Sequence, residues 1–413
     1  IIKRYQHIGP AERDAARWLL LDLVGTLIAG TQTPLHHILR QCAPNIWGGQ
    51  TRSMTGVTRL SRAGAALVDG MTLDAVDAHD GFRPAKGHVG CGLLPALIAL
   101  GRDDTLLDDL VIGYELGSRL GATLHATAPD YHTSGAWIAP CVAAVGGLAL
   151  CDDQWSHGVG IAEYHGPRSP MMRGIAHPTM LKDGSGWGAM AGVAAIEMAA
   201  QGFTGAPADT LAPALTDLDD RWLIHQQYLK PYACCRWAHP AIDALKSALR
   251  LHPIEPARIQ IHTFAAGVAL SQQWPQNTEQ AQYSSRFAIA QAMRHPQVLY
   301  PQVSSEALSD DGARDWFNKI ELIDDPELTA RFPEQRFARA VLVGTQGQSF
   351  AGPSVQAAGD PETPMSHEQI RLKFHAQCEG VLSANAMDAI ADIIVSGTAR
   401  PSEWLSYLPS AQA

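Results

Sequence analysis

The fold is decided by the stretch AERDAARWLLLDLVGTLIAG, residues 11–30. Its apolar side chains recur every three or four residues, which is the period of an α-helix. They are Ala16, Leu19, Leu20, Leu23, Val24 and Leu27. Pro10 stands at the start of the pattern and Gly30 at its end, where proline and glycine commonly begin and end helices. The stretch therefore predicts a helix with a broad apolar face.

Five further segments have the same character. They are rich in small residues and apolar on more than one face, a pattern typical of helices that are buried on most sides. They are RAGAALVDGMTLDAV (62–76), LLPALIALG (93–101), LLDDLVIGYELGSRLGATL (106–124), GAWIAPCVAAVGGLALC (135–151) and GWGAMAGVAAIEMAAQG (186–202). Together these segments predict a compact helical domain.

The pattern changes after about residue 222. The segments ARIQIHTF (257–264) and FARAVLVGTQGQSFAG (337–352) alternate like strands, and YSSRFAIAQAMRH (283–295) between them has a helical period. Four residues mark a linker: Pro353, Gly359, Pro361 and Pro364. SHEQIRLKFHAQC (366–378) resumes a helix, with Ser366 as its N-cap. We expect a mostly α fold in which a helical domain of residues 1–222 and 363–413 carries an inserted α+β domain of residues 223–362.

Composition excludes several classes of protein. The chain has 413 residues, 46% of them hydrophobic, which is enough to bury a core in each of two domains. The formal net charge is −10 and no basic run occurs, so we expect no nucleic-acid partner. No apolar run reaches the length of a membrane span, so we expect none. Seven cysteines without a CxxC pair, and no signal-peptide pattern at the start, predict a cytoplasmic protein.

The segment VDAHDGFRPAKGHVGCG, residues 76–92, concentrates chemistry-bearing side chains among four glycines. They are Asp77, His79, Asp80, Arg83, Lys86 and His88. Proton transfer beside a bound carboxylate requires acids, bases and cations together. The alternative interpretation is a solvated loop with a helix-capping aspartate. A metal site of His79, Asp80 and His88 is conceivable, but it lacks a recognised ligand spacing.

The segment MMRGIAHPTMLKDGSGWGAMAG, residues 171–192, is a second candidate. Lys182 precedes three glycines and a helix of small residues, so it can join the free N–H groups of a helix N-terminus in binding an anion. The glycine–lysine order differs from that of a phosphate-binding loop. The alternative is an ordinary surface lysine.

Two more segments carry candidate residues. YHTSG (131–135) places His132 just before a helix, where a capping role is the alternative to a functional one. KPYACCRWAHPAID (230–243) lies where the domains join, and ligand sites favour such interfaces. Its candidates are Lys230, Tyr232, Arg236 and His239. No GxSxG motif and no complete dinucleotide fingerprint occur, so neither a serine hydrolase nor a nucleotide-dependent oxidoreductase is indicated.

Taken in order, these segments resemble the MmgE/PrpD family, which includes 2-methylcitrate dehydratase, cis-aconitate decarboxylase and iminodisuccinate epimerase. The resemblance covers nearly the whole chain. It rests on LLLDLVGTLIAG (19–30), AALVDGMTLDAVDAHD (65–80), GHVGCGLLPALIALG (87–101), GYELGSRLG (113–121), DYHTSG (130–135), PTMLKDGSG (178–186), GFTGAP (202–207), KPYACCRWAHPAID (230–243) and GDPETPMSHEQIRLKF (359–374).

The resemblance implies a large helical domain, a smaller α+β lid, an active site between them and a homodimer. It implies no cofactor and no metal. It assigns Asp77, His88, His132 and Lys182 to catalysis. The substrate-binding set that we expect is Asp80, Lys86, Lys230, Tyr232 and Arg168.

The chain departs from the family pattern at several positions. Relatives commonly have a histidine soon after the position of Lys182, and often one at the position of Asp74. Cis-aconitate decarboxylases have a histidine where Cys235 stands. One residue is inserted between Asp77 and His88, and Lys86 has no counterpart. These departures argue most against cis-aconitate decarboxylase itself.

The sequence thus predicts a cofactor-independent lyase that transfers a proton at a carbon next to a carboxylate. We favour a dehydratase of a small hydroxy di- or tricarboxylate. An epimerase or isomerase of a dicarboxylate and a decarboxylase are alternatives within the family. A non-catalytic helical protein with an anion pocket is the alternative from another class.

Overall fold

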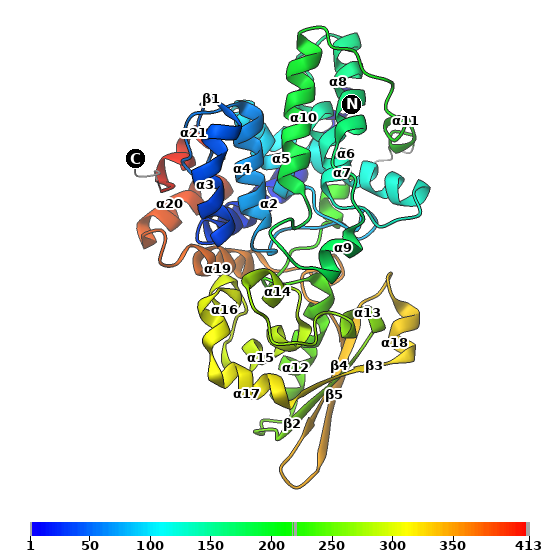
Figure 1. The fold of residues 1–413 in the computed structure, drawn as a ribbon, viewed down its shortest axis with the longest axis vertical. Helices are drawn as coiled ribbons and strands as arrows, with labels where there is room; N and C mark the ends of the chain where they lie inside the picture. Colours follow the sequence, from blue (N-terminus) through cyan, green and yellow to red (C-terminus); the bar gives the residue numbers. More distant parts are fainter. Residues whose placement is uncertain (1, 217, 219–220, 410–413) are drawn as a thin grey trace.

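A computed structural model describes residues 2–216, 218 and 221–409, and these form two parts stacked along the long axis (Figure 1). The upper part is helical, and the prediction of a mostly α chain is confirmed. Its helices and one short strand are α1 (Ile2–Tyr5), α2 (Pro10–Gly30), α3 (Pro34–Ile46), β1 (Gly48–Thr51), α4 (Arg62–Asp74), α5 (Gly90–Ala99), α6 (Leu106–Thr127), α7 (Gly135–Gly146), α8 (Asp152–His165), α9 (Met171–Ala176), α10 (Ser185–Ala200), α11 (Leu211–Ala214), α19 (His367–Cys378), α20 (Ala384–Val395) and α21 (Pro401–Trp404).

The lower part combines helices with a four-stranded sheet (Figure 1). Its elements are α12 (His239–Leu251), β2 (Arg258–Thr263), α13 (Ala265–Val268), α14 (Thr278–Gln282), α15 (Ser285–Arg294), α16 (Tyr300–Val303), α17 (Asp311–Lys319), β3 (Ile320–Asp324), α18 (Pro326–Arg331), β4 (Phe337–Val343) and β5 (Ser349–Gln356).

The helix α2 has the predicted bounds, and its second half is buried along its whole length. The C-terminal helix α19 packs against it. Within this contact Lys373 donates to the carboxylate of Asp22 at 2.6 Å, and the amide of Gln377 donates to Thr26 at 3.2 Å. The chain therefore returns to the upper part after the sheet, and the capping box of Ser366 starts the returning helix as predicted.

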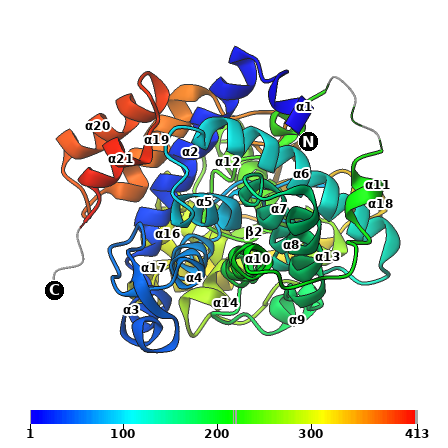
Figure 2. The ribbon, with the colours of Figure 1, turned by 90° about the horizontal axis from the view of Figure 1, so that it is seen from above.

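Small residues allow helix α10 to lie at the centre of the upper part. Seen along the long axis, α10 is surrounded by α4, α5, α7 and α8 (Figure 2). A Cβ atom at Gly186 would come within 2.6 Å of the backbone of Leu67 and of Met71. Because any side chain at this position would push α4 away, the glycine is what brings the start of α10 against the end of α4.

The sheet of the lower part has the strand order β3-β2-β4-β5. The two strand predictions are confirmed, since residues 257–264 contain β2 and residues 337–352 contain β4 and the start of β5. We missed β3, which pairs parallel with β2. Its mixed exposure shows no regular alternation, so a short strand of this kind leaves no period in the sequence.

Pro353 corrects the predicted linker, because it lies inside β5 and not after it. Strand β5 is at the edge of the sheet, where a missing N–H is tolerated. The register with β4 also shifts between Arg339 and Val341, so the proline sits at an irregularity of the ladder.

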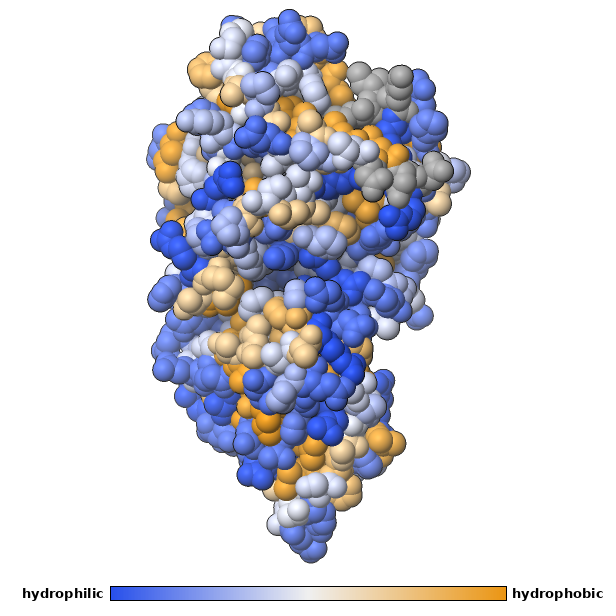
Figure 3. Space-filling view, turned by 90° about the vertical axis from the view of Figure 1, so that its right-hand side faces the viewer, coloured by the Kyte–Doolittle hydropathy of each residue, from blue (hydrophilic) through white to orange (hydrophobic). Residues whose placement is uncertain are grey.

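The junction of the two parts is packed, and the site described below is built there. The apolar core of the lower part includes Val76, Ala78 and Met171, which belong to the upper part. Figure 3 shows a hollow at this level, where hydrophilic residues gather on the surface. Among the described residues, no helix has the length and apolar character needed to cross a bilayer.

Candidate active site

A cavity of about 230 Å³ lies at the junction, with walls from both parts. A volume of this order suits a small metabolite. The ionisable residues that line it are Asp77, Lys86, His88, Asp183, Lys230, Arg236 and Arg336, together with Tyr131, Tyr228, Cys235 and Tyr283. Four of the predicted site residues thus share one cavity: Asp77, Lys86, His88 and Lys230.

Asp77 and Lys230 form a buried ion pair across the junction. The ammonium of Lys230 contacts both the carboxylate and the backbone carbonyl of Asp77, and neither side chain is more than 6% exposed. Burial alone would raise the pKa of Asp77, but the charges of Lys230 and then Lys182 hold it below its ordinary value. Burial would likewise lower the pKa of Lys230, and Asp77 raises it instead. The pair therefore stays ionised.

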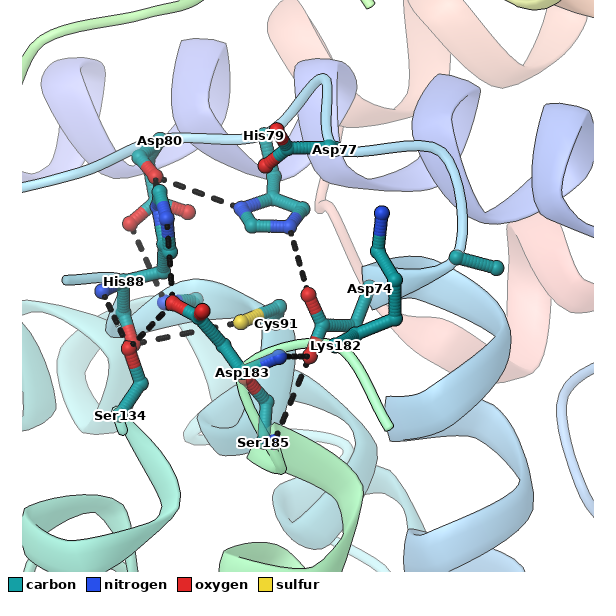
Figure 4. Close-up of polar contacts among 12 residues, drawn as sticks. Asp74, Asp77, His79, Asp80, His88, Cys91, Ser134, Lys182, Asp183 and Ser185 are labelled. Carbon is teal, nitrogen blue, oxygen red and sulfur yellow. Dashed lines mark hydrogen bonds and ion pairs between the residues drawn. The ribbon is translucent and has the colours of Figure 1, made fainter. Parts of the chain in front are cut away.

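His88 and Asp183 form a second pair on the wall of the cavity (Figure 4). The Nδ1–H of His88 donates to the backbone carbonyl of Asp80, which leaves Nε2 with its lone pair. This Nε2 lies 3.4 Å from Oδ2 of Asp183. Ser134 donates to the same carboxyl oxygen at 3.0 Å.

The environment of this pair favours its uncharged forms. Burial raises the pKa of Asp183 to about 7, with the negative charges of Asp74 and Asp77 acting in the same direction. Burial, followed by the positive charge of Lys230, holds the pKa of His88 well below 6.5. Near neutral pH the cavity therefore presents a neutral imidazole base beside a carboxyl group that can still hold its proton.

Asp74, at the end of α4, accepts hydrogen bonds from the backbone of the segment that carries Asp183. One oxygen of Asp74 accepts hydrogen bonds from the backbone N–H groups of Asp183 at 3.2 Å and of Ser185 at 3.4 Å. Its other oxygen lies 3.4 Å from Nε2 of His79. Burial would raise the pKa of Asp74, but His79 lowers it, so Asp74 stays an anion. This fixed charge both caps the start of α10 and holds the proton on Asp183.

The backbone around the cavity is held in an unusual conformation. Within the described part of the chain, five residues other than glycine have a positive φ in the left-handed region. Three of them are predicted site residues: Asp77 at 53°, Lys86 at 51° and Lys182 at 49°. Such conformations are costly for residues with a Cβ and gather at functional sites. Two of the segments that we selected from the sequence, residues 76–92 and 171–192, therefore share this feature.

Lys182 lies close to the cavity without lining it. The side chain is buried, with 5% exposed, which rules out the ordinary surface lysine that we considered. Its Nζ donates to the amide oxygen of Gln282 at 2.5 Å and stands 5.4 Å from the ring centroid of Tyr283, which does line the cavity. Figure 4 shows the side chain extending between Asp74 and Asp77.

Four other predicted residues have different surroundings and line no part of this cavity. Asp80 is buried and accepts hydrogen bonds from the backbone N–H groups of residues 89 and 90, so it caps α5. The backbone N–H of His132 donates to Nε2 of His125 at 3.1 Å. Tyr232 donates to Asp243 at 2.6 Å. Arg168 lines a separate hollow beside α7 and α8. For Asp80, the helix-capping interpretation fits the contacts.

The arginines of the cavity differ in their partners. Arg236, in the junction segment, pairs with Asp360 at 2.8 Å and donates to the carbonyl of Ala358 at 2.9 Å. Arg336, just before β4, is 7% exposed, and its Nε and Nη1 atoms have no hydrogen-bond partner among the described residues. The cavity wall therefore carries one buried guanidinium that forms no ion pair of its own among the described residues. Asp360 lies within range of its charge, but that carboxylate pairs with Arg236.

The side chains that we considered for a metal site are engaged elsewhere. His79 faces Asp74, and His88 is bonded to the carbonyl of Asp80. Within the described ranges, no three His, Cys, Asp or Glu side chains are grouped as metal ligands.

Sequence reasoning missed Asp183 and Arg336. Asp183 follows Lys182 directly and precedes Gly184, whose φ of 65° forms the turn into α10. An acid between a candidate lysine and a glycine turn was the available signal. Arg336 stands alone among unremarkable residues, and no signal in the sequence marks it.

Models of one family match both halves of the chain. The MmgE/PrpD N-terminal domain matches residues 3–216, and the MmgE/PrpD C-terminal domain matches residues 232–396. The chain belongs to the MmgE/PrpD family. The resemblance seen in the sequence is thereby confirmed.

Curated relatives within the MmgE/PrpD family are distant but nearly full-length. The chain is 22% identical to the cis-aconitate decarboxylase-like protein oryM of Aspergillus oryzae, over 92% of this chain and 89% of the relative. It is 21% identical to cis-aconitate decarboxylase of Mus musculus, over 91% and 84% of the two chains. The enzyme of that name from Aspergillus terreus is also 21% identical, over 93% and 88%.

Proposed function

We propose that this MmgE/PrpD protein is a lyase that eliminates water from a small hydroxy di- or tricarboxylate. The observation that carries the proposal is the pair of His88 and Asp183 in a cation-lined cavity. A neutral imidazole is a base for a carbon-bound proton, and a protonated carboxyl group is an acid for a leaving hydroxide. Lys230 and Arg236, which line the cavity beside their carboxylate partners, donate hydrogen bonds to the carboxylate that activates the carbon.

The proposed step conserves atoms and charge. Nε2 of His88 takes the proton from the carbon beside a carboxylate. The electron pair of that C–H bond forms the C=C bond as the neighbouring C–O bond breaks. Asp183 gives its proton to the departing hydroxide, which leaves as water. The imidazolium of His88 then returns a proton to the Asp183 carboxylate across their 3.4 Å separation, and the pair is reset.

The closeness of the two groups favours elimination over epimerisation. Groups 3.4 Å apart reach neighbouring substrate atoms from the same side. Epimerisation instead needs a proton to leave one face of a carbon and another to arrive on the opposite face, which a contact pair does not provide. The proposal therefore includes a syn geometry for the loss of water.

Decarboxylation is the second candidate, and the relatives' names favour it. Against it stands Cys235, which lines the cavity at the position where the sequence resemblance leads us to expect a histidine in decarboxylases. Burial raises the pKa of this thiol to about 12, so it stays neutral and offers little acid at neutral pH. A purely anion-binding protein remains the candidate from another class, but it gains nothing from carboxyl groups that face an anion.

The remaining assignments form part of the same proposal. Asp77 keeps Lys230 in place, and Lys182 adds positive charge beside the reacting end. The catalytic role that we expected for His132 passes to Asp183 in this proposal, because His132 does not line the cavity. We propose the insert of residues 223–362 as the lid that closes the cavity over the substrate.

A panel of hydroxy and unsaturated di- and tricarboxylates, followed by NMR in D2O, tests the proposed reaction. We expect one hydroxy acid to give an alkene, and the reverse hydration to place one deuterium on carbon. Release of CO2 would replace the dehydratase by a decarboxylase. Deuterium uptake without any alkene would support an epimerase. Binding of an acid without any chemical change would contradict all three reactions and support a non-catalytic anion-binding protein.

The pH profile gives a separate prediction. The proposed acid is lost as Asp183 ionises, so we expect kcat/KM to fall as the pH rises through about 7. Asp74 contributes to that raised pKa, so Asp74→Asn should move the alkaline limb to lower pH. Measured profiles of both proteins check this. An alkaline limb that stays in place in the variant would show that Asp183 is not the group that titrates.

A further inference from the structure

Arg336 has no role in the chemistry proposed above, and its surroundings are unusual. The residue is 7% exposed, yet within the described chain its Nε and Nη1 atoms have no hydrogen-bond partner and it forms no ion pair. The carboxylate of Asp360 is influenced by its charge but pairs with Arg236. Burying an unpaired charge is unfavourable, so such a group usually has a partner. Arg236, in the same wall, shows the usual solution, since Asp360 neutralises it.

Arg336 lies at the outer end of the cavity. Arg336, Lys86 and Pro333 line the cavity and also an outer hollow on the surface. They therefore stand between the cavity and the outside. His88, Asp183 and Lys230 line the cavity but not the outer hollow, so they belong to its inner end.

The acids of the outer hollow do not supply the missing partner. Glu334 and Glu362 line it, but in the described structure neither pairs with Arg336. Glu362 pairs instead with Arg83, which also donates to the backbone carbonyl of Glu334 at 3.4 Å. Lys86, which is exposed, is a further cation that lines this end. Arg336 and Lys86 thus line the mouth of the cavity without forming an ion pair in the described structure.

We propose that Arg336 binds the carboxylate of the substrate that lies farthest from the reacting carbon. The free guanidinium offers two N–H groups to a planar carboxylate, which arginine binds in a bidentate way. The site therefore selects acids with a second carboxylate over monocarboxylates of the same length. This inference rests on the proposed function, which identifies the end of the substrate that reacts. It adds the residue that binds the carboxylate at the other end.

Ligand binding without turnover tests the inference. The probes are propane-1,2,3-tricarboxylate, which has no hydroxyl group to eliminate, and butyrate, its monocarboxylate counterpart. Calorimetry on the full chain should show that Arg336→Met weakens binding of the tricarboxylate by about 30-fold or more, as the loss of a buried charge contact does. Butyrate binding should not change, and Arg336→Lys should recover part of the loss.

Thermal melting distinguishes a binding role from a structural one. Because Arg336 has no partner, Arg336→Met should melt at or above the temperature of the wild type in the absence of ligand. Arg236→Met, which leaves the carboxylate of Asp360 unpaired, should melt lower. The control Arg339→Met removes an arginine of β4 that lines neither the cavity nor the outer hollow, and its binding should match the wild type.

Several outcomes would overturn the inference. One is an equal loss of affinity for both probes in Arg336→Met, and another is unchanged affinity for the tricarboxylate in that variant. A third is Arg336-dependent binding of inorganic phosphate by a protein that does not bind the tricarboxylate. The inference and the proposed reaction fail separately. Arg336-dependent binding by a protein that dehydrates no acid contradicts only the reaction, whereas turnover with unchanged selectivity in Arg336→Met contradicts only the inference.

Discussion

Replacing His88 with asparagine is expected to lower kcat/KM by about 10²- to 10⁴-fold, the usual contribution of a positioned acid or base. The imidazole is the base in the proposed elimination, and asparagine keeps a polar group of similar size without a basic nitrogen. Burial keeps the pKa of His88 well below 6.5, so the base is present in its active form at neutral pH. Steady-state kinetics with the acid that the NMR panel identifies measure the effect.

The control for this variant is His375→Asn. His375 lies on α19 and faces Asp388 at 3.5 Å on the surface, so its loss should leave kcat/KM unchanged. Melting temperatures of both variants show whether the fold is retained. A folded His88→Asn protein with the activity of the wild type would remove His88 from the mechanism.

Replacing Lys230 with methionine is expected to reduce the free energy of unfolding by about 3–5 kcal/mol, the cost of breaking a buried ion pair by removing one partner. Lys230 is 1% exposed and Asp77 is 4% exposed. Without the ammonium, the carboxylate of Asp77 stays buried with its main counter-charge gone. Urea denaturation at neutral pH measures the loss.

The double variant Asp77→Asn/Lys230→Met is the internal control, because it removes both charges. It should be more stable than Lys230→Met alone, since no uncompensated charge remains. The exposed ion pair of Arg371 and Asp392 provides a surface control. Arg371→Met should reduce the free energy of unfolding by no more than about 1 kcal/mol. A loss for Lys230→Met as small as that of the surface variant would contradict the account of this pair.

The regular elements of the fold were predictable where burial imposes a period. Helix α2 begins at Pro10 and ends at Gly30 as the apolar spacing predicts, and the alternation in residues 337–352 predicts the hairpin of β4 and β5. Strand β3 and the position of Pro353 were not predictable in this way. Both depend on where a strand lies in the sheet, and that is decided by partners distant in the sequence.

The candidate site was predictable only where several polar residues stand together among glycines. Asp77 and His88 share such a segment, and Lys230 lies in another. His132 has the same local appearance, but its segment turns its neighbour Tyr131 into the cavity instead. Arg336 acquires its significance from burial without a partner, which is a property of the folded chain alone.

The proposed roles of the cavity are tested most directly by the crystal structure of His88→Asn with the hydroxy acid bound. The account predicts one carboxylate against Arg336, another near Lys230, and the reacting carbon next to residue 88 with its hydroxyl group near Asp183. A second hollow, lined by Thr133, Arg173 and Lys182, offers a different location on the same chain. An acid bound there, or bound in the cavity with its hydroxyl group turned away from Asp183, would contradict the account.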